Sequence, residues 1–129
     1  MVRATSSPSK GPDSMDKWEI QLRKGCLELA ILATLWGGRR YGLEILDRLE
    51  RESNLVLSEG TIYPLLSRLK EERMLDSEWV DAEAGHPRKY YRLTPMGRRR
   101  AVQMARVWAR FTASLDGLIA PLAKEDLRA

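Results

Sequence analysis

Apolar side chains recur every three or four positions along much of this chain, which is the spacing of one face of an α-helix. Between Asp16 and about Gly37 two such stripes run side by side, and the stretch CLELAILATLW is apolar nearly all round. A helix of that kind needs neighbours on several sides. We therefore predict a central first helix that stops at Gly37 and Gly38, because glycine suits a helix C-terminus.

Two shorter helices are predicted next. The first covers residues 41–53, with a Glu44–Arg48 pair on its solvent side. Its predicted buried stripe is Leu43, Ile45, Leu46 and Leu49. The second follows Ser58, a suitable N-cap, although Pro64 favours a later or irregular start because proline disrupts a helix interior. Its predicted core positions are Ile62, Leu65, Leu66, Leu69, Met74 and Leu75.

A pair of short strands follows, residues 76–80 and 88–93, with Gly85 and Pro87 as turn residues between them. Side chains alternate between the two faces of a strand. In the second strand one face has Lys89, Tyr91 and Leu93, and the other has Arg88, Tyr90 and Arg92. The first face is predicted to cover a core, and the second to meet a partner.

A long last helix begins at Thr94, with Pro95 at the first position, where proline is tolerated. Apolar side chains then follow one another at alternating spacings of three and four residues, which is the a/d seam of a coiled coil. The seam consists of Ala101, Met104, Trp108, Phe111, Leu115, Leu118 and Leu122. Because no later element covers it, the seam predicts a second chain as partner.

Positive charge is concentrated in one part of the chain. The net charge is +4, but residues 88–110 carry eight arginine and lysine side chains and no acid, so the remainder has a net charge of −4. Local positive charge on a body that is not basic favours one anionic partner surface, most often nucleic acid. A solvated basic face is the alternative.

The order of elements predicts a mainly α fold with a small β-hairpin, namely a winged helix-turn-helix followed by a long C-terminal dimerisation helix. Residues 1–15 are rich in Ser, Pro and Gly and are predicted to be a disordered N-terminal tail without the apolar core of a secretory signal. Residues 16–93 form the predicted DNA-binding domain, and residues 94–129 the dimerisation helix. No apolar run is long enough for a membrane span, so we expect a cytoplasmic protein.

The sequence offers little for catalysis or metal binding. Its one cysteine, Cys26, and its one histidine, His86, make neither a metal site nor an internal disulfide. Paired carboxylates in a plausible site, a Ser/His/Asp set and a glycine-rich phosphate loop are not found. We therefore expect no catalytic residue, no metal and no cofactor. Trp36 and Trp79 are interpreted as core residues.

Winged helix-turn-helix domains place the start of a recognition helix in the major groove, while the hairpin wing contacts phosphates or the minor groove. We predict double-stranded DNA with a pseudo-palindromic operator as the partner of a homodimer. The predicted DNA contacts are Tyr41, Ser58, Thr61, Tyr63, Arg68, Arg88, Lys89 and Arg92. The alternative is a winged-helix module that binds protein and has no specific affinity for DNA.

Four stretches, KGCLELAILATL, YGLEILDRL, EGTIYPLLSRL and RKYYRLTPMGR, together resemble the PadR family of bacterial transcriptional regulators over roughly residues 22–100. The resemblance implies a homodimeric repressor with winged-helix reading heads and a C-terminal dimerisation helix. With a single long C-terminal helix, the chain looks like the small branch of the family. That branch includes regulators that bind flat aromatic drugs between their subunits.

The same resemblance suggests an effector site on the last helix. Trp108 falls where a tryptophan of drug-binding relatives stacks on the drug, so two copies would sandwich an aromatic ring. The predicted ligand contacts are Trp108, Met104, Phe111 and Thr112. Thr112 stands where such relatives can have an acid, so a cationic drug would lack a counter-charge. Packing in the dimer seam is the alternative role for Trp108, Met104 and Phe111.

Overall fold

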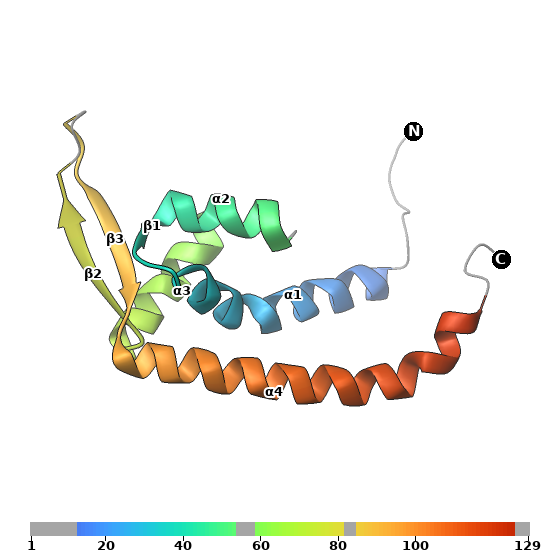
Figure 1. Cartoon of the computed structure of the whole chain (residues 1–129). Helices are drawn as coiled ribbons and strands as arrows, with labels where there is room; N and C mark the ends of the chain where they lie inside the picture. The colour runs from blue at the N-terminus through green and yellow to red at the C-terminus, as the bar shows by residue number, and fades with distance from the viewer. Residues whose placement is uncertain (1–12, 54–58, 82–84, 126–129) are drawn as a thin grey trace, which may run out of the picture.

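The structure, a computed structural model, describes residues 13–53, 59–81 and 85–125 (Figure 1). Its elements are α1 (Asp13–Thr34), β1 (Arg40–Tyr41), α2 (Gly42–Ser53), α3 (Glu59–Glu71), β2 (Leu75–Val80), β3 (Arg88–Leu93), α4 (Pro95–Ile119) and the 3₁₀ helix η1 (Ala120–Lys124). This is the predicted order of three helices, a hairpin and a long last helix. The mainly α winged helix-turn-helix fold is confirmed.

Helices α1, α2 and α3 pack around one apolar core, and the sheet closes it on one side (Figure 1). The fully buried side chains come from these helices, the turn after α1 and β2: Ile31, Leu32, Leu35, Ile45, Leu49, Ile62, Leu66, Leu69 and Leu75. Tyr91 and Leu93 of β3 are buried against them, as the alternation in that strand predicts. Leu65 and Met74 are only partly buried at the edge of the core.

The sheet has three antiparallel strands in the order β1–β3–β2, one strand more than the predicted hairpin. Tyr41 was predicted to begin the second helix. Instead Arg40 and Tyr41 form β1, in register with Tyr91 and Tyr90 of β3. The backbone turns sharply before β1 at Gly38, whose φ of 147° is a conformation that favours glycine. The first helix also begins at Asp13, three residues earlier than predicted.

Two predictions about α2 are wrong. Leu43 is not buried but 52% exposed, because in the first turn of α2 it faces the wing rather than the core. Glu44 does not pair with Arg48, because its carboxylate accepts a hydrogen bond from the Tyr41 backbone N–H at 3.0 Å and so caps the helix start. Arg48 instead forms an ion pair with Glu52, one turn further along α2.

The start of α4 is held against the turn between α3 and β2. The Thr94 hydroxyl accepts a hydrogen bond from the Gly97 N–H at 2.9 Å, as an N-cap does, and donates one to the Arg73 carbonyl at 2.6 Å. A Cβ at residue 97 would lie 2.0 Å from the carbonyl oxygen of Met74, so only glycine permits this close crossing. The prediction of Thr94 and Pro95 at the start of the last helix is confirmed.

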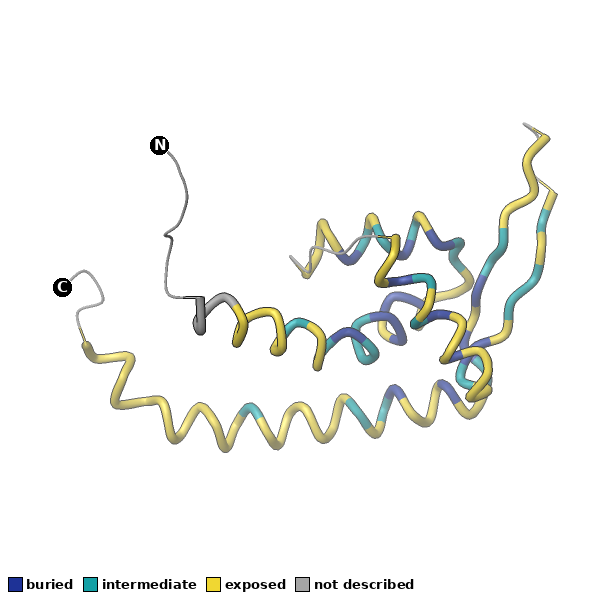
Figure 2. Tube along the Cα trace, turned by 180° about the vertical axis from the view of Figure 1, so that it is seen from behind, coloured by how far each residue is buried: buried dark blue, intermediate teal, exposed yellow. Residues whose placement is uncertain are grey.

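Helix α4 runs along α1 and then continues beyond it (Figure 1). Its first turns bury Gly97 and Ala101, whereas most of its remaining length is exposed (Figure 2). None of the helices in the described part of the chain has the length and apolar character of a membrane-spanning segment. Within the described residues, one long apolar strip of α4 therefore has no covering element.

Candidate nucleic-acid interface

An open pocket of about 470 Å³ lies between the start of α2, helix α3 and the wing formed by β2 and β3. We call it the wing pocket. Its lining residues are Tyr41, Gly42, Leu43, Tyr63, Trp79, Arg88, Lys89 and Tyr91. Four of the predicted DNA contacts, Tyr41 of β1, Tyr63 of α3, and Arg88 and Lys89 of β3, therefore come together here from three elements. None of the described residues that line this pocket is acidic.

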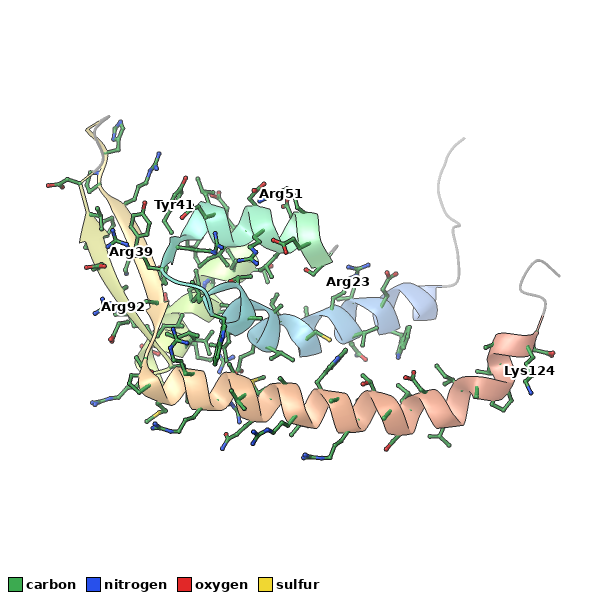
Figure 3. All side chains as sticks on the ribbon, viewed as in Figure 1. Arg23, Arg39, Tyr41, Arg51, Arg92 and Lys124 are labelled. Atoms are coloured by element: carbon green, nitrogen blue, oxygen red, sulfur yellow. The ribbon has the colours of Figure 1, made fainter. Side chains whose placement is uncertain are left out.

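Aromatic rings hold the cations of this face in a continuous stack. The Arg88 guanidinium lies 4.6 Å from the centre of the Tyr41 ring, and that ring meets the Tyr90 ring edge-on at 5.4 Å. The Arg39 guanidinium lies over the Tyr90 ring, 4.7 Å from its centre. Figure 3 places Arg39 and Tyr41 beside the wing. A ring orients a guanidinium without neutralising it, so the N–H groups of Arg88 stay available to an anion, whereas Arg39 is also paired with the Glu78 carboxylate.

Lys89 is held in a similar way on the other face of β3. Its ammonium lies 5.8 Å from the ring centres of both Trp79 and Tyr91. Trp79 is opposite Lys89 in the strand register and is 68% exposed. The expectation that Trp79 belongs to the core is therefore wrong, because the wing extends past the helices that would cover it.

Gly42 lets helix α3, the predicted recognition helix, lie against the start of α2. A Cβ at residue 42 would lie 2.5 Å from Cε1 of the Tyr63 ring and 2.6 Å from its hydroxyl oxygen. Burial of the phenol, and then the nearby negative charge of Glu59, raise the pKa of Tyr63 above its ordinary value. Burial likewise raises the pKa of Tyr91. Both side chains are therefore neutral hydroxyl groups at physiological pH.

The remaining predicted contacts lie around this pocket. Thr61 is exposed in the first half of α3. Arg92 is exposed on the wing, 4.0 Å from the Glu78 carboxylate that Arg39 also contacts at 2.6 Å. Ser58, the proposed cap and DNA contact, lies outside the described residues.

Arg68 differs from Arg88 and Lys89 because two carboxylates hold it. Its guanidinium donates to Glu72, the residue directly after α3, at 2.9 Å and to Glu28 of α1 at 3.3 Å. The bond to Glu72 and then the bond to Glu28 raise the pKa of Arg68 further above its ordinary value. The predicted DNA contact of Arg68 would therefore require the guanidinium to leave these carboxylates first.

Sequence reasoning missed Leu43, Trp79 and Arg39. Leu43 and Trp79 supply the exposed apolar walls of the wing pocket, and Arg39 supplies the outer cation of the aromatic stack. The two signals available were the position of Leu43 directly after the Tyr-Gly pair and the place of Trp79 near the turn of the hairpin. Neither signal distinguishes a wall residue from a core residue without the sheet register.

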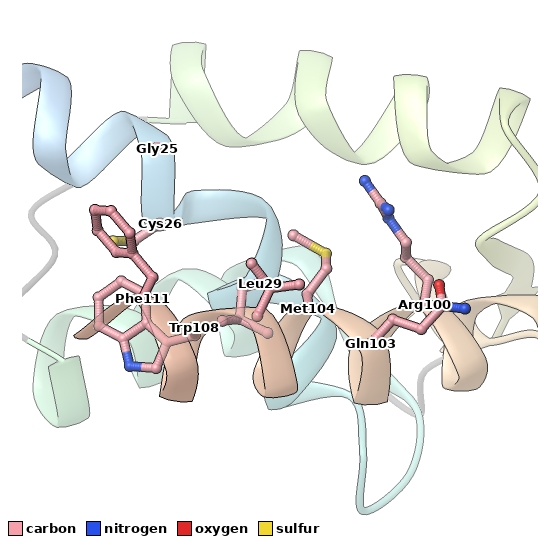
Figure 4. Close-up of a pocket in the computed structure, with 9 residues that line it drawn as sticks. Gly25, Cys26, Leu29, Arg100, Gln103, Met104, Trp108 and Phe111 are labelled. Carbon is pink, nitrogen blue, oxygen red and sulfur yellow. The ribbon is translucent and has the colours of Figure 1, made fainter. Parts of the chain in front are cut away.

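A second site lies on the opposite side of α1, where α4 passes beneath it (Figure 4). This open groove of about 530 Å³ is lined by Gly25, Cys26, Leu29, Arg100, Gln103, Met104, Val107, Trp108 and Phe111. It brings together three of the four predicted ligand contacts, Trp108, Met104 and Phe111. The fourth, Thr112, is not among the lining residues, and its hydroxyl donates to the Trp108 carbonyl of its own helix at 2.8 Å.

Comparison with known proteins decides which family this is. Residues 31–103 match the model of the transcriptional regulator PadR-like family, which is more than half of the chain. The chain belongs to the PadR-like family of transcriptional regulators. The matched part begins in α1, spans α2, α3 and the wing, and ends in the first third of α4.

Solved structures of PadR-like regulators agree. A PadR-like transcription factor from Bacteroides fragilis is 36% identical, with 79% of this chain and 98% of that chain covered and a TM-score of 0.66. A PadR-like regulator from Bacillus cereus is 30% identical over 77% and 96% of the two chains, with a TM-score of 0.70. A PadR family regulator from Eggerthella lenta is also 30% identical, over 83% and 89%, with a TM-score of 0.71.

Membership of the PadR-like family fixes the general function. The protein is a DNA-binding transcription regulator and not an enzyme. In a winged-helix regulator, the face that carries α3 and the wing is the one that meets DNA, and here that face holds the wing pocket with its cations.

Proposed function

We propose that this PadR-like regulator is a homodimeric repressor that binds a pseudo-palindromic operator and is released from it by a small, flat aromatic effector. The observation that carries the proposal is the apolar strip of α4, which continues out of the domain with large side chains exposed. Phe111 is 59% exposed, Leu118 78% and Leu122 63%. Exposed apolar patches of this kind mark contact surfaces.

A second copy of the chain is the partner that this strip favours. Along α4 its residues keep the a/d spacing of a coiled coil from Ala101 to Leu118, and Leu122 follows in η1. Trp18, Ile20 and Leu22 of α1 are exposed as well. Two such strips related by a two-fold axis are self-complementary, since each presents the same face to the other. The dimer would present two recognition helices about one helical turn of DNA apart, roughly 34 Å.

The DNA contacts divide by chemistry. Thr61 and Tyr63, in the first half of α3, are proposed to reach base edges in the major groove. Arg88, Lys89 and Arg92 of the wing are proposed to bind phosphates, with Tyr41 orienting Arg88. Ser58 is proposed as a backbone contact at the start of α3, and Arg68 as a base contact once it leaves its carboxylates.

The effector is proposed to bind in the groove between α1 and α4. Trp108 and Phe111 offer flat aromatic surfaces there and Met104 a deformable apolar one. Thr112, one turn after Trp108, is proposed as a further contact. Its volume of about 530 Å³ is that of a drug-sized site. An effector releases DNA only if it binds the released geometry of the dimer more tightly than the operator-bound one. The protein would act in the cytoplasm.

Sedimentation equilibrium tests the dimer on which this function depends. The wild-type chain is expected to be a dimer at micromolar concentration, and Leu118→Glu a monomer, because a charge in the seam cannot be desolvated without a partner. Ala113→Glu, on the opposite face of α4, is the matched control and should remain a dimer. A monomeric wild type, or a dimer that Leu118→Glu leaves intact, would rule out the proposed interface.

A further inference from the structure

One carboxylate lies where three helices meet. Glu28 of α1 accepts a hydrogen bond from Arg68 of α3 at 3.3 Å through Oε1. Its Oε2 lies 3.5 Å from Nε of Arg100 of α4. The Glu28 side chain is 20% exposed, compared with 46% for the Glu72 carboxylate. Glu28 is therefore the better shielded of the two acids that hold Arg68.

Both distances to Glu28 are long for charge-assisted hydrogen bonds, which are usually about 2.7–2.9 Å. The contact between Arg68 and Glu72, by comparison, is 2.9 Å. Glu28 is thus shared between two guanidinium groups and optimal for neither. If one of them leaves, the carboxylate is free to close on the other, because nothing then opposes that movement electrostatically.

Arg100 connects this ion-pair junction to the effector groove. It is the one charged side chain among the described residues that line the groove. Figure 4 shows Arg100 at one end of the groove and Trp108 and Phe111 at the other. A molecule that stacks on the aromatic end and accepts hydrogen bonds from Arg100 would compete directly with Glu28 for the guanidinium.

Arg68 connects the same junction to the recognition helix. It stands in the second half of α3, two turns after Thr61, and is held by carboxylates on both sides. Any use of Arg68 by DNA requires its release from Glu28. Arg100 favours that release, because it draws the same carboxylate toward α4.

We propose that Glu28 is a positioning residue that couples the groove to the recognition helix. While Arg100 contacts Glu28, the ion pair between Glu28 and Arg68 is weak, and Arg68 is released readily to the operator. When an occupant of the groove binds Arg100, Glu28 moves closer to Arg68, that ion pair strengthens, and operator affinity falls. The inference rests on the proposed DNA-binding role of Arg68. It gives the effector a route to α3 that passes through two ion pairs and needs no change in the core.

The test compares Arg100→Gln with Arg99→Gln, which removes the same charge from the exposed neighbouring position. Dissociation constants are measured by fluorescence anisotropy on a duplex taken from upstream of the protein's own gene. Arg100→Gln is expected to bind about threefold more weakly than Arg99→Gln, within the range of exposed ion pairs. Glu28→Gln should bind more tightly than wild type, and in its background Arg100→Gln and Arg99→Gln should bind equally.

Equal affinities of Arg100→Gln and Arg99→Gln in the wild-type background would overturn the proposal, as would a difference that persists without Glu28. Unchanged melting temperatures show that the variants are folded. The Nε–Hε NMR signal of Arg68, recorded without DNA, separates this inference from the proposed function. It should shift in Arg100→Gln and stay in place in Arg99→Gln, even if no duplex binds. An Arg68 signal at the same position in wild type and Arg100→Gln would disprove the coupling.

Discussion

The guanidinium of Arg88 lies 4.6 Å above the ring of Tyr41, so that the wing and the short strand before α2 meet in one cation–π contact. The contact fixes the cation at the rim of the wing pocket and leaves its N–H groups free of any carboxylate in the described residues. Ion-paired Arg68 shows the opposite arrangement. Arg88 is therefore directly available to a phosphate, whereas Arg68 would first have to leave its carboxylates.

Removal of Arg88 should weaken binding to all duplexes alike. Arg88→Ala deletes a proposed phosphate contact, and each such contact contributes about 0.9 to the slope of log affinity against log salt. We expect that slope to fall by about one unit, with an unchanged ratio of operator to scrambled affinity. The control is Arg106→Ala, which removes an exposed cation from the outer face of α4 and should leave the slope unchanged.

Removal of Thr61 should have the opposite signature. The threonine is proposed to contact a base edge, so Thr61→Ala should lower operator affinity by about 1 kcal/mol and leave scrambled affinity unchanged. Competition experiments with single-base variants of the operator measure this directly. A uniform loss across all sequences would show that Thr61 contacts only the backbone.

Gly97→Ala should destabilise the fold by more than 2 kcal/mol. In a helix interior alanine is normally more favourable than glycine by about 1 kcal/mol. Here, however, the added Cβ would stand 2.0 Å from the backbone carbonyl of Met74, which cannot move without displacing β2. Urea denaturation followed by circular dichroism gives the free energy of unfolding. A neutral or stabilising effect would contradict the close crossing of α4 over Met74.

Gly42→Ala should behave differently, although its added Cβ also collides. The atoms in its way belong to the ring of Tyr63, which can rotate, so the loss of stability should be below about 1 kcal/mol. The displaced ring should nevertheless lower operator affinity. In a Tyr63→Ala background the Gly42→Ala change should have no further effect on binding, and an additive loss would show that the two residues act separately.

Trp108 should control binding of flat aromatic molecules in the groove. The dye 8-anilinonaphthalene-1-sulfonate combines an aromatic surface with an anionic group to which the Arg100 guanidinium would donate hydrogen bonds. We expect Trp108→Ala to weaken dye binding about fivefold, within the range of aromatic stacking. Trp79→Ala, which removes an exposed tryptophan far from the groove, should leave it unchanged. Equal effects of the two substitutions would mean that the dye binds elsewhere.

The parts of this structure that depend on local pattern were predictable. The helical periodicity, the Thr-Pro start of α4 and the alternation in β3 each follow from neighbouring residues, and the structure confirms them. The parts that depend on distant partners were not. Strand β1 exists only because Arg40 and Tyr41 pair with β3, some fifty residues later.

The same reason explains the errors within the candidate sites. Leu43 matches a buried stripe by spacing, but the wing lies on its side of α2, so it lines a pocket instead. Arg68 looks like a free cation on a recognition helix, whereas Glu28 reaches it from forty residues earlier in the chain. Charge and periodicity locate a functional face, and only the tertiary contacts show which cations on it are paired.

Competitive DNA binding tests the central claim most directly. The labelled duplex from upstream of the protein's own gene is titrated at about 150 mM salt, where nonspecific phosphate binding is already weak, in the presence of excess scrambled duplex. A sequence-specific repressor should bind tightly as two chains per duplex and resist the competitor. Equal, salt-sensitive binding to both duplexes, or no binding at all, would contradict the account, and the second result would favour a winged-helix module that binds protein.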